Sequence, residues 1–246
     1  MRRRFFVDAV RNGHAAIEGE DARHLTRVLR VAPEQRYEIS DNADVYLAEI
    51  ESAHKDRVVF RTIEKLEARE SGARVILYAA LIKFDRFEWI VEKATELGVT
   101  EIVPVETARS ERGLERAAGK RLERWRRIAL EASQQSRRAR LPDVREPISF
   151  EAALSQPASF RLVLDEEPAE GAAPLLTALP RELAPEDSIA LLTGPEGGWT
   201  ERERAALAEA GWIRVWLGPL ILRAETAAIA AVAVASQMLA GMRVDP

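Results

Sequence analysis

The chain has 246 residues, 47% of them hydrophobic, and a formal net charge of −4, which suits one large or two ordinary globular domains and excludes a disordered or fibrous protein. It contains no cysteine, so disulfides, thiolate zinc sites and cysteine nucleophiles are excluded, and the three histidines are too scattered to predict a metal site. The N-terminus has no apolar stretch of signal-peptide length, and charges interrupt every membrane-span candidate except the alanine-rich C-terminal region. We therefore expect a cytoplasmic protein that needs neither a membrane nor a metal.

Residues 1–70 have the alternating pattern of short strands, which predicts a small β-barrel or sandwich. The expected strands cover residues 3–9, 35–40, 45–53 and 56–66. A helix is expected around residues 21–29, where His24, Arg27 and Arg30 stand at helical spacing. These three side chains would form a basic stripe for RNA phosphates, although an ordinary exposed helix face gives the same pattern.

The periodicity changes at residues 67–74, where we place a domain boundary, and a β-α-β pattern follows. A buried strand is expected at 74–82 and another at 99–105. Between them, Asp85 with Glu88 is a candidate capping box, and Gly98 is the expected end of the helix. A crossover helix between two strands predicts a parallel sheet covered by helices.

The segment from Arg109 to Arg140 has eleven basic residues against four glutamates, a net charge of +7 in an otherwise acidic chain. Its apolar residues follow helical spacing, so one face would pack in the core and the basic side chains would face solvent. A concentrated basic face can attract a polyanion because screening limits charge effects to about 10 Å. A solvated helix face is the alternative.

The last third of the chain predicts two consecutive strand-loop-helix units. A strand at 188–194 leads to a glycine turn and to a helix that starts with a capping box of Thr200 and Glu203 and ends at Gly211. A strand at 212–218 leads to a second polar loop and an apolar helix at 227–240. In open α/β sheets, ligands bind at the carboxyl ends of such strands. Before this region, residues 160–167 predict one further strand.

The glycine turn joins Gly194, Gly197 and Gly198 with Pro195 and the carboxylate of Glu196. It has neither the lysine of a P-loop nor G-x-G-x-x-G spacing, which disfavours phosphate anchoring and a nicotinamide-binding oxidoreductase. Glu196 suits a ligand with positive charge or hydrogen-bond donors, whereas a purely structural turn would leave it in solvent.

The second loop carries Arg223, Glu225 and Thr226 after three apolar residues. Two polar loops over an apolar floor are what an adenine-containing cofactor needs. The following helix is apolar on nearly every side, so we expect burial inside the domain or under a second subunit.

Several motifs in this order and spacing resemble the ribosomal RNA small subunit methyltransferase E family of the SPOUT superfamily. The matching segments are residues 4–6, 24–30, 83–99, 108–110, 124–142, 191–203 and 217–227. The resemblance implies an α/β fold in which a PUA-like β-barrel at 1–70 precedes a SPOUT methyltransferase domain at 73–246. It also implies a deep trefoil knot and cofactor site at about 190–230, a homodimer, and S-adenosylmethionine-dependent methylation of N3 of one uridine in 16S rRNA of the small ribosomal subunit.

The resemblance further implies the site residues. The cofactor pocket would be lined by Leu192, Thr193, Gly194, Glu196, Gly197, Gly198, Leu217, Gly218, Leu222, Arg223, Thr226 and Ala227. Apart from the resemblance, we expect RNA phosphates to be bound by the basic residues Arg4, His24, Arg27, Arg30, Lys83, Arg86, Arg109, Arg112 and Arg138.

For catalysis we expect Arg223 to stabilise negative charge on the uracil oxygens, and Glu225 or Glu196 to orient groups or accept the N3 proton. A cap of the last helix, or an ion pair with Arg223, is the alternative role of Glu225. The chain departs from the family pattern at Leu220, where arginine is usual, and at Gln134, where glutamate is usual. Three other functions stay open: methylation of another RNA position, methylation of a ribose 2′-OH, and non-catalytic RNA binding in ribosome assembly.

Overall fold

The computed structural model describes residues 3–68, 72–111, 113–166 and 172–242, and these divide into two compact units. The first unit comprises residues 1–70 together with 133–141, and the second comprises 71–132 and 142–246. Residues 133–141 therefore pack with the first unit, whereas the sequence pattern predicts them in the second. Arg112 lies outside the described residues.

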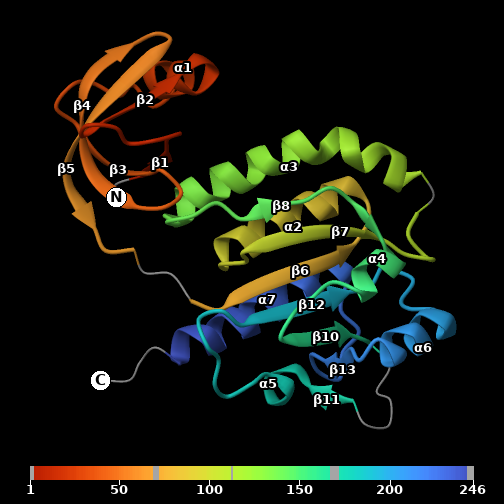
Figure 1. Cartoon of the computed structure of the whole chain (residues 1–246). Helices are drawn as coiled ribbons and strands as arrows, with labels where there is room; N and C mark the ends of the chain where they lie inside the picture. The colour runs from red at the N-terminus through yellow and green to blue at the C-terminus, as the bar shows by residue number, and fades with distance from the viewer. Residues whose placement is uncertain (1–2, 69–71, 112, 167–171, 243–246) are drawn as a thin grey trace. The chain divides into compact units, whose positions relative to one another are not determined.

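The first unit is a five-stranded sheet in the order β1-β3-β4-β5-β2, with one helix (Figure 1). The strands and helix are β1 (Arg4–Phe6), β2 (His14–Glu18), α1 (Gly19–Arg27), β3 (Arg36–Ser40), β4 (Val45–His54) and β5 (Arg57–Leu66). β1 runs parallel to β3 and the other pairs are antiparallel. Phe5, Ile39 and Phe60 form its core because alternate side chains of each strand face inward.

Two features of this unit differ from the expectation. The strand β2 is not among the expected strands, because its two alanines weaken its strand signal. The helix α1 ends at Arg27 and Arg30 follows it with φ 51°, so only His24 and Arg27 of the expected stripe stand on the helix.

Glu38 of β3 ties residue 137 to the first unit. Burial raises the pKa of its carboxyl, but hydrogen bonds from Arg4 and Arg137 outweigh this and hold the pKa below its ordinary value of 4.5. The Arg4 Nη2 to Glu38 Oε2 distance is 2.8 Å, and Arg4 Nη1 also donates to the Arg137 carbonyl at 2.6 Å. Arg4, expected at the RNA interface, is thus engaged within the fold.

We predict that acid loosens this unit by protonating Glu38. When the pKa of a carboxyl is lower in the folded than in the unfolded state, its ionised form stabilises the fold. This contribution is complete above the pKa of the unfolded state and is lost as the pH falls through the pKa of the folded state. Glu38→Gln should remove the part of this pH dependence that comes from Glu38 and cost about 2 kcal/mol at pH 7, as expected for charged hydrogen bonds. Hydrogen–deuterium exchange of β1 and β3 at pH 7 and pH 4, corrected for intrinsic rates, measures both effects. An unchanged pH response in Glu38→Gln would assign the acid sensitivity elsewhere.

The second unit is built on a parallel sheet in the order β11-β13-β10-β12-β6-β7-β8, with β9 also pairing with β7. Its strands are β6 (Arg74–Ala80), β7 (Glu101–Glu106), β8 (Asp143–Val144), β9 (Ile148–Ser149), β10 (Phe160–Leu164), β11 (Ala173–Pro174), β12 (Ser188–Thr193) and β13 (Ile213–Trp216). All described pairs in it are parallel. β12 is buried at every position, as expected for a central strand covered on both faces.

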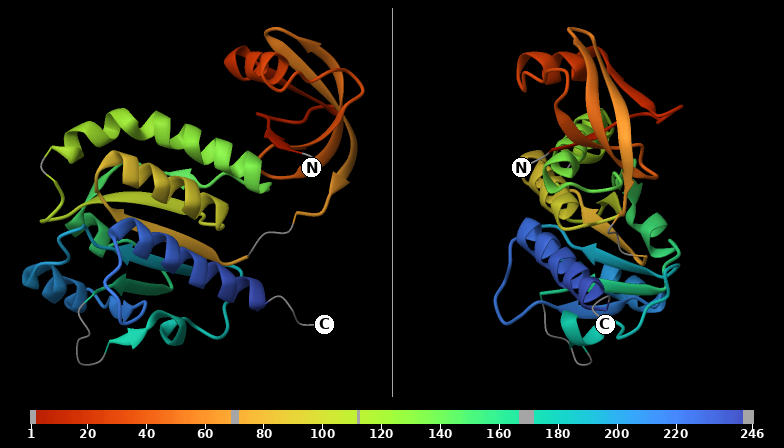
Figure 2. Two further views of the ribbon diagram at one scale, coloured as in Figure 1. Left: turned by 180° about the vertical axis from the view of Figure 1, so that it is seen from behind. Right: turned by 90° about the vertical axis from the view of Figure 1, so that its left-hand side faces the viewer.

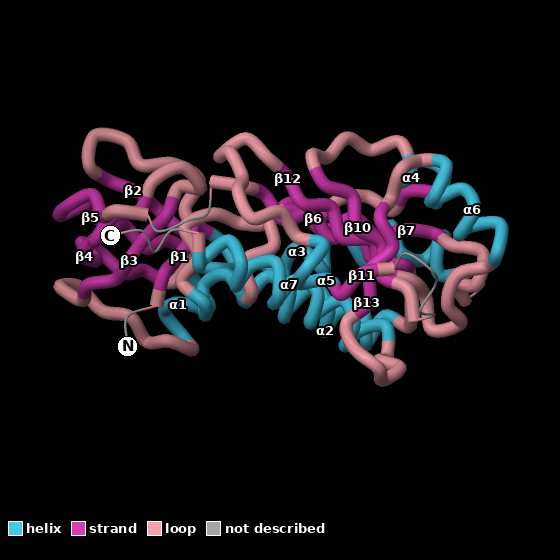
Figure 3. The backbone as a smooth tube through the Cα atoms, turned by 90° about the horizontal axis from the view of Figure 1, so that it is seen from below, coloured by secondary structure: helices cyan, strands magenta, loops and turns pink. Residues whose placement is uncertain are grey.

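Helices cover both faces of this sheet (Figure 2). The larger cluster joins one face to α2 (Phe84–Glu96), α3 (Leu114–Ser136), α5 (Leu175–Ala178) and α7 (Ala224–Gly241). The other face packs on α4 (Phe150–Leu154) and α6 (Glu201–Glu209). Figure 3 shows the helices in cyan beside the magenta strands.

The helix α2 begins one residue before the expected cap. Its N-cap is Lys83, without a side-chain hydrogen bond, so the predicted cap at Asp85 is wrong and Asp85 lies in the first turn. Glu88 instead accepts from Arg124 Nε at 2.5 Å and Nη2 at 2.7 Å. Those hydrogen bonds lower the pKa of Glu88. The expected end is confirmed, because Gly98 has φ 99°, which a side chain would strain.

The helix α7 has the length and hydropathy of a membrane span, yet 33% of that window is buried inside the fold. Ala228, Ala231, Val232 and Ala235 pack in the larger core cluster. Other apolar residues of α7 are partly exposed. That a second subunit covers them stays a prediction.

Candidate active site

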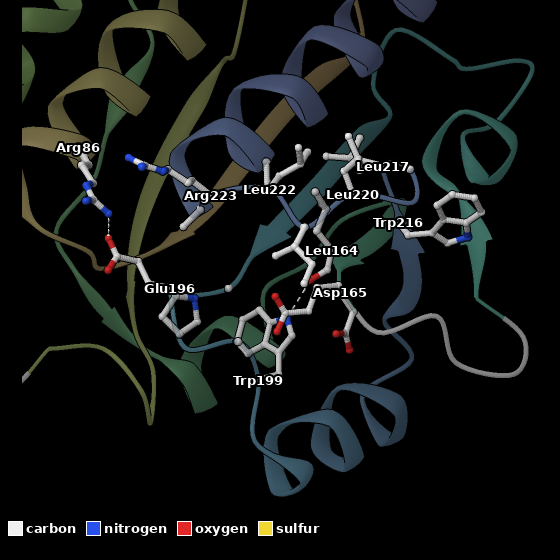
Figure 4. Close-up of a pocket in the computed structure, with 18 residues that line it drawn as sticks. Arg86, Leu164, Asp165, Glu196, Trp199, Trp216, Leu217, Leu220, Leu222 and Arg223 are labelled. Atoms are coloured by element: carbon white, nitrogen blue, oxygen red, sulfur yellow. Dashed lines mark hydrogen bonds and ion pairs between the residues drawn. The ribbon is translucent and has the colours of Figure 1, made fainter.

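A cavity of about 430 Å³ lies in the second unit, where β10, β12 and β13 end. Its walls come from the last residues of β10 and β13, from the segments that follow β10, β12 and β13, and from α2 and the start of α7 (Figure 4). The lining residues are Arg86, Leu164, Asp165, Glu166, Gly194, Pro195, Glu196, Gly198, Trp199, Trp216, Leu217, Gly218, Leu220, Ile221, Leu222, Arg223, Ala224 and Ala227. The position agrees with the rule that parallel sheets bind ligands at their carboxyl edge.

Most of the predicted pocket residues line this cavity. They are Gly194, Glu196, Gly198, Leu217, Gly218, Leu222, Arg223 and Ala227. Leu192 and Thr193 are instead buried within β12, and neither Gly197 nor Thr226 contributes to the wall. Glu225 also stays out of the wall, although Arg223 and Ala224 before it and Ala227 after it take part.

The glycine turn after β12 is held in shape by a buried tryptophan and needs its glycines. The indole nitrogen of Trp199 donates to the Leu164 carbonyl at 2.8 Å, and a Cβ at Gly194 would stand 3.0 Å from the indole ring. Gly198 has φ 67°, and a Cβ there would meet the Glu166 carboxylate at 2.7 Å. A side chain at either glycine would therefore displace the wall of the cavity.

The helix α6 follows the turn with the predicted capping box. Glu203 accepts from the Thr200 amide at 2.9 Å and from its hydroxyl at 2.8 Å, while the Thr200 hydroxyl accepts from the Glu203 amide. The second oxygen of Glu203 accepts from the Ala108 amide at 2.8 Å. The loop after β7 is thereby tied to the start of α6.

Arg109, expected at the RNA interface, contributes to the same connection. Its guanidinium donates to the Gly197 carbonyl at 2.6 Å and to the Trp199 carbonyl at 3.4 Å. Arg109 thus supports the glycine turn from the loop after β7, with its side chain still exposed.

The end of β10 supplies residues that the sequence analysis missed. Asp165 is buried and accepts from Arg204 Nε at 2.9 Å and from Arg214 Nη2 at 2.7 Å, which joins the ends of β10, α6 and β13. Glu166 follows it on the cavity wall. The available signal was a predicted strand that runs into consecutive carboxylates.

Among the charged residues of the cavity wall, Arg86, Glu196 and Arg223 are open to solvent and form its mouth, whereas Asp165 is buried. Arg86 of α2 pairs with Glu196 of the glycine turn (Figure 4). Arg223, the N-cap residue of α7, is exposed. Glu225 is 5% exposed, and its Oε2 atom has no hydrogen-bond partner among the described residues.

The remaining basic candidates lie in both units. Lys83 is exposed at the start of α2 in the second unit. In the first unit His24, Arg27 and Arg30 are exposed, while Arg138 Nε donates to the Arg140 carbonyl at 3.0 Å.

Similarity to known proteins covers almost the whole chain. A family model described as RNA methyltransferase domain matches residues 69–236, and one described as RNA methyltransferase PUA domain matches residues 17–63. Ribosomal RNA small subunit methyltransferase E of Bacillus subtilis is 34% identical, with 92% of each chain covered. The protein of the same name from Aquifex aeolicus is 30% identical, covering 93% of this chain and 97% of its own.

Solved structures give the same result. Ribosomal RNA small subunit methyltransferase E from Neisseria gonorrhoeae, bound to S-adenosyl methionine, has a TM-score of 0.82 at 33% identity and covers 95% of this chain and 96% of its own. A putative methyltransferase from Legionella pneumophila in complex with SAM has a TM-score of 0.84 at 28% identity, covering 96% and 98%. With its PUA-type first unit and parallel-sheet second unit, the chain belongs to the ribosomal RNA small subunit methyltransferase E family.

Proposed function

We propose that this protein transfers a methyl group from S-adenosylmethionine to N3 of one uridine in 16S rRNA of the small ribosomal subunit. The observation that carries the proposal is the cavity at the ends of β10, β12 and β13, lined by eight of the twelve residues that the family resemblance implies. Membership of the family supports the rRNA substrate. We place the reaction in the cytoplasm, where ribosomal subunits assemble.

The cavity fits this cofactor in shape and chemistry. Leu164, Leu217 and Leu222 offer an apolar surface for adenine, and a Cβ at Gly218 would meet nothing within 4 Å, so its backbone borders open space. The carboxylates of Glu166 and Glu196 suit the positive charges of the ligand. When bound, S-adenosylmethionine supplies an electrophilic methyl group.

Arg223 and Glu225 are the residues we assign to the chemistry of the uracil. N3 carries a proton at neutral pH, and its loss spreads negative charge onto the two carbonyl oxygens. The guanidinium of Arg223 at the cavity mouth would donate hydrogen bonds to that charge. Glu225 is 5% exposed and its Oε2 atom has no hydrogen-bond partner among the described residues, which suits a group that orients others beside the cavity. Glu196 lines the cavity and is the other candidate to accept the proton.

The target base must leave its stack before it can enter the cavity, by flipping or by capture of an unpaired nucleotide. We propose that His24, Arg27, Arg30, Lys83, Arg86 and Arg138 contact the RNA phosphates. Arg109 would act mainly through the glycine turn. We further propose the trefoil knot at about 190–230 and the homodimer, with the partly exposed apolar residues of α7 supporting the second subunit.

The direct test is methyl transfer from labelled S-adenosylmethionine to small ribosomal subunits that lack the modification, followed by nucleoside identification. Label in 3-methyluridine would establish the reaction. Label in a 2′-O-methylated or other nucleoside would favour methylation elsewhere. Tight cofactor binding without label would favour a non-catalytic assembly protein, and Leu220→Arg, at a position 77% exposed on the cavity wall, would then test whether activity returns.

Basic residues of α1 and its end allow a matched test of RNA binding. Arg27 and Arg30 form no ion pair within the described residues, whereas Arg23 on the same helix pairs with Asp56 at 2.7 Å. Arg27→Ala with Arg30→Ala should weaken RNA binding and reduce its salt dependence by about 0.7 for each phosphate that is no longer neutralised. Arg23→Ala should change the slope less. Filter binding between about 50 and 200 mM salt measures both slopes. Equal slopes in all variants would remove α1 from the interface.

A further inference from the structure

The ion pair between Arg86 and Glu196 stands at the mouth of the cavity. Arg86 comes from α2 and Glu196 from the glycine turn, 110 residues further along the chain, and both line the cavity. Their side chains are 31% and 45% exposed. The contact therefore joins a predicted RNA-binding residue to a predicted cofactor-binding residue.

The ion pair between Arg86 and Glu196 can be broken at a small cost in free energy. Ion pairs that remain open to solvent contribute little, because water screens the charges and two long side chains lose freedom. Arg86 contacts Glu196 through one guanidinium nitrogen and one carboxylate oxygen, so the present pair lacks the bidentate geometry that strengthens arginine contacts to carboxylates and phosphates alike. A backbone phosphate of RNA would thus compete with the Glu196 carboxylate for Arg86.

The positive charges around Arg86 favour replacement of the Glu196 carboxylate by an RNA phosphate. Figure 4 shows the Arg223 side chain extending toward the Arg86–Glu196 pair. Arg223 forms no ion pair within the described residues, so its charge at the cavity mouth is not neutralised there. Lys83, three residues before Arg86, is also exposed.

Glu196 has a second candidate partner inside the cavity. The described cavity wall contains no lysine and no other arginine than Arg86 and Arg223. A bound ligand with positive charge, such as the sulfonium and ammonium groups of the proposed cofactor, would therefore attract Glu196 away from Arg86. The Glu196 carboxylate can therefore pair with either Arg86 or the bound ligand.

We propose that Arg86 pairs with Glu196 in the free protein and with an RNA phosphate in the complex. The positively charged cofactor would attract Glu196 and so leave Arg86 available for the phosphate. This inference rests on the proposed function. Because binding linkage is reciprocal, the cofactor tightens RNA binding and RNA tightens cofactor binding by the same factor. From the usual strength of an exposed ion pair, that factor is about two- to fivefold.

The test measures Kd for small ribosomal subunits that lack the modification, with and without a saturating unreactive amine analogue of S-adenosylmethionine. In the wild-type protein the analogue should tighten binding about two- to fivefold. Without the analogue, Glu196→Gln should bind the subunits about two- to fivefold more tightly than the wild-type protein. Addition of the analogue should then leave its Kd for the subunits almost unchanged. Arg86→Ala should bind more weakly than wild type in both conditions, and the double variant should match Arg86→Ala. The analogue concentration is set from each variant's own Kd for it.

Glu201→Gln is the matched control, because it removes one carboxylate from the start of α6 whose side chain is 89% exposed and pairs with Arg204. It should behave as wild type. Equal or weaker subunit binding by Glu196→Gln, or an analogue effect that persists in Arg86→Ala, would overturn the exchange. Absence of subunit binding by the wild-type protein would overturn the proposed function as well, whereas intact coupling without label in 3-methyluridine would overturn only the methylation site.

Discussion

Arg223→Ala is expected to lower the rate of methyl transfer by about 100- to 1,000-fold at saturating cofactor and RNA, the usual loss when one donor to developing negative charge is removed. The residue is the N-cap of α7, lines the cavity and has an exposed side chain, which a base entering the cavity could reach. In the proposed reaction, negative charge on the uracil oxygens grows only as the N3 proton leaves. An interaction made in the transition state lowers kcat when it is removed.

Arg223→Lys separates the charge of this side chain from its geometry. Lysine retains the positive charge but cannot donate two parallel hydrogen bonds, so we expect intermediate activity. Cofactor affinity, measured by titration calorimetry, distinguishes loss of catalysis from loss of the pocket. Full turnover by Arg223→Ala with normal cofactor affinity would show that the charge is stabilised by another group.

Much of the second unit could be predicted from sequence because its elements carry strong local signals. Ala118, Leu122, Trp125 and Ala129 stand at helical spacing, and all four are buried on α3 as expected. The capping box of Thr200 was equally explicit, because two side chains three residues apart satisfy each other's backbone amides.

The missed features depend on contacts between distant residues. Asp85 had a capping partner in sequence, yet Glu88 pairs with Arg124, 36 residues away. Similarly, Asp165 accepts from two arginines, 39 and 49 residues distant. Local patterns do not encode such pairings. The eight predicted residues on the cavity wall were predicted from the family resemblance. The pattern of the glycine turn alone is equally compatible with a purely structural turn that binds no ligand.

Asp165→Ala is expected to have the largest effect on stability. The carboxylate is 3% exposed and is shared by Arg204 and Arg214, so its removal leaves two partly buried positive charges close together. Breaking a buried ion pair by removing one partner costs about 3–5 kcal/mol. We expect a value near the lower limit, because Arg214 is 25% exposed and Arg204 also pairs with Glu201.

Urea unfolding followed by tryptophan fluorescence measures this loss in the right part of the molecule, since all five tryptophans belong to the second unit. Glu201→Gln removes the exposed partner of Arg204 and should cost less than about 1 kcal/mol. Equal costs for the two variants would mean that Asp165 does not hold the strand ends together. If it does, β10 and β13 separate slightly in Asp165→Ala, and because both carry residues of the cavity wall, the folded variant should also bind S-adenosylmethionine more weakly than Glu201→Gln.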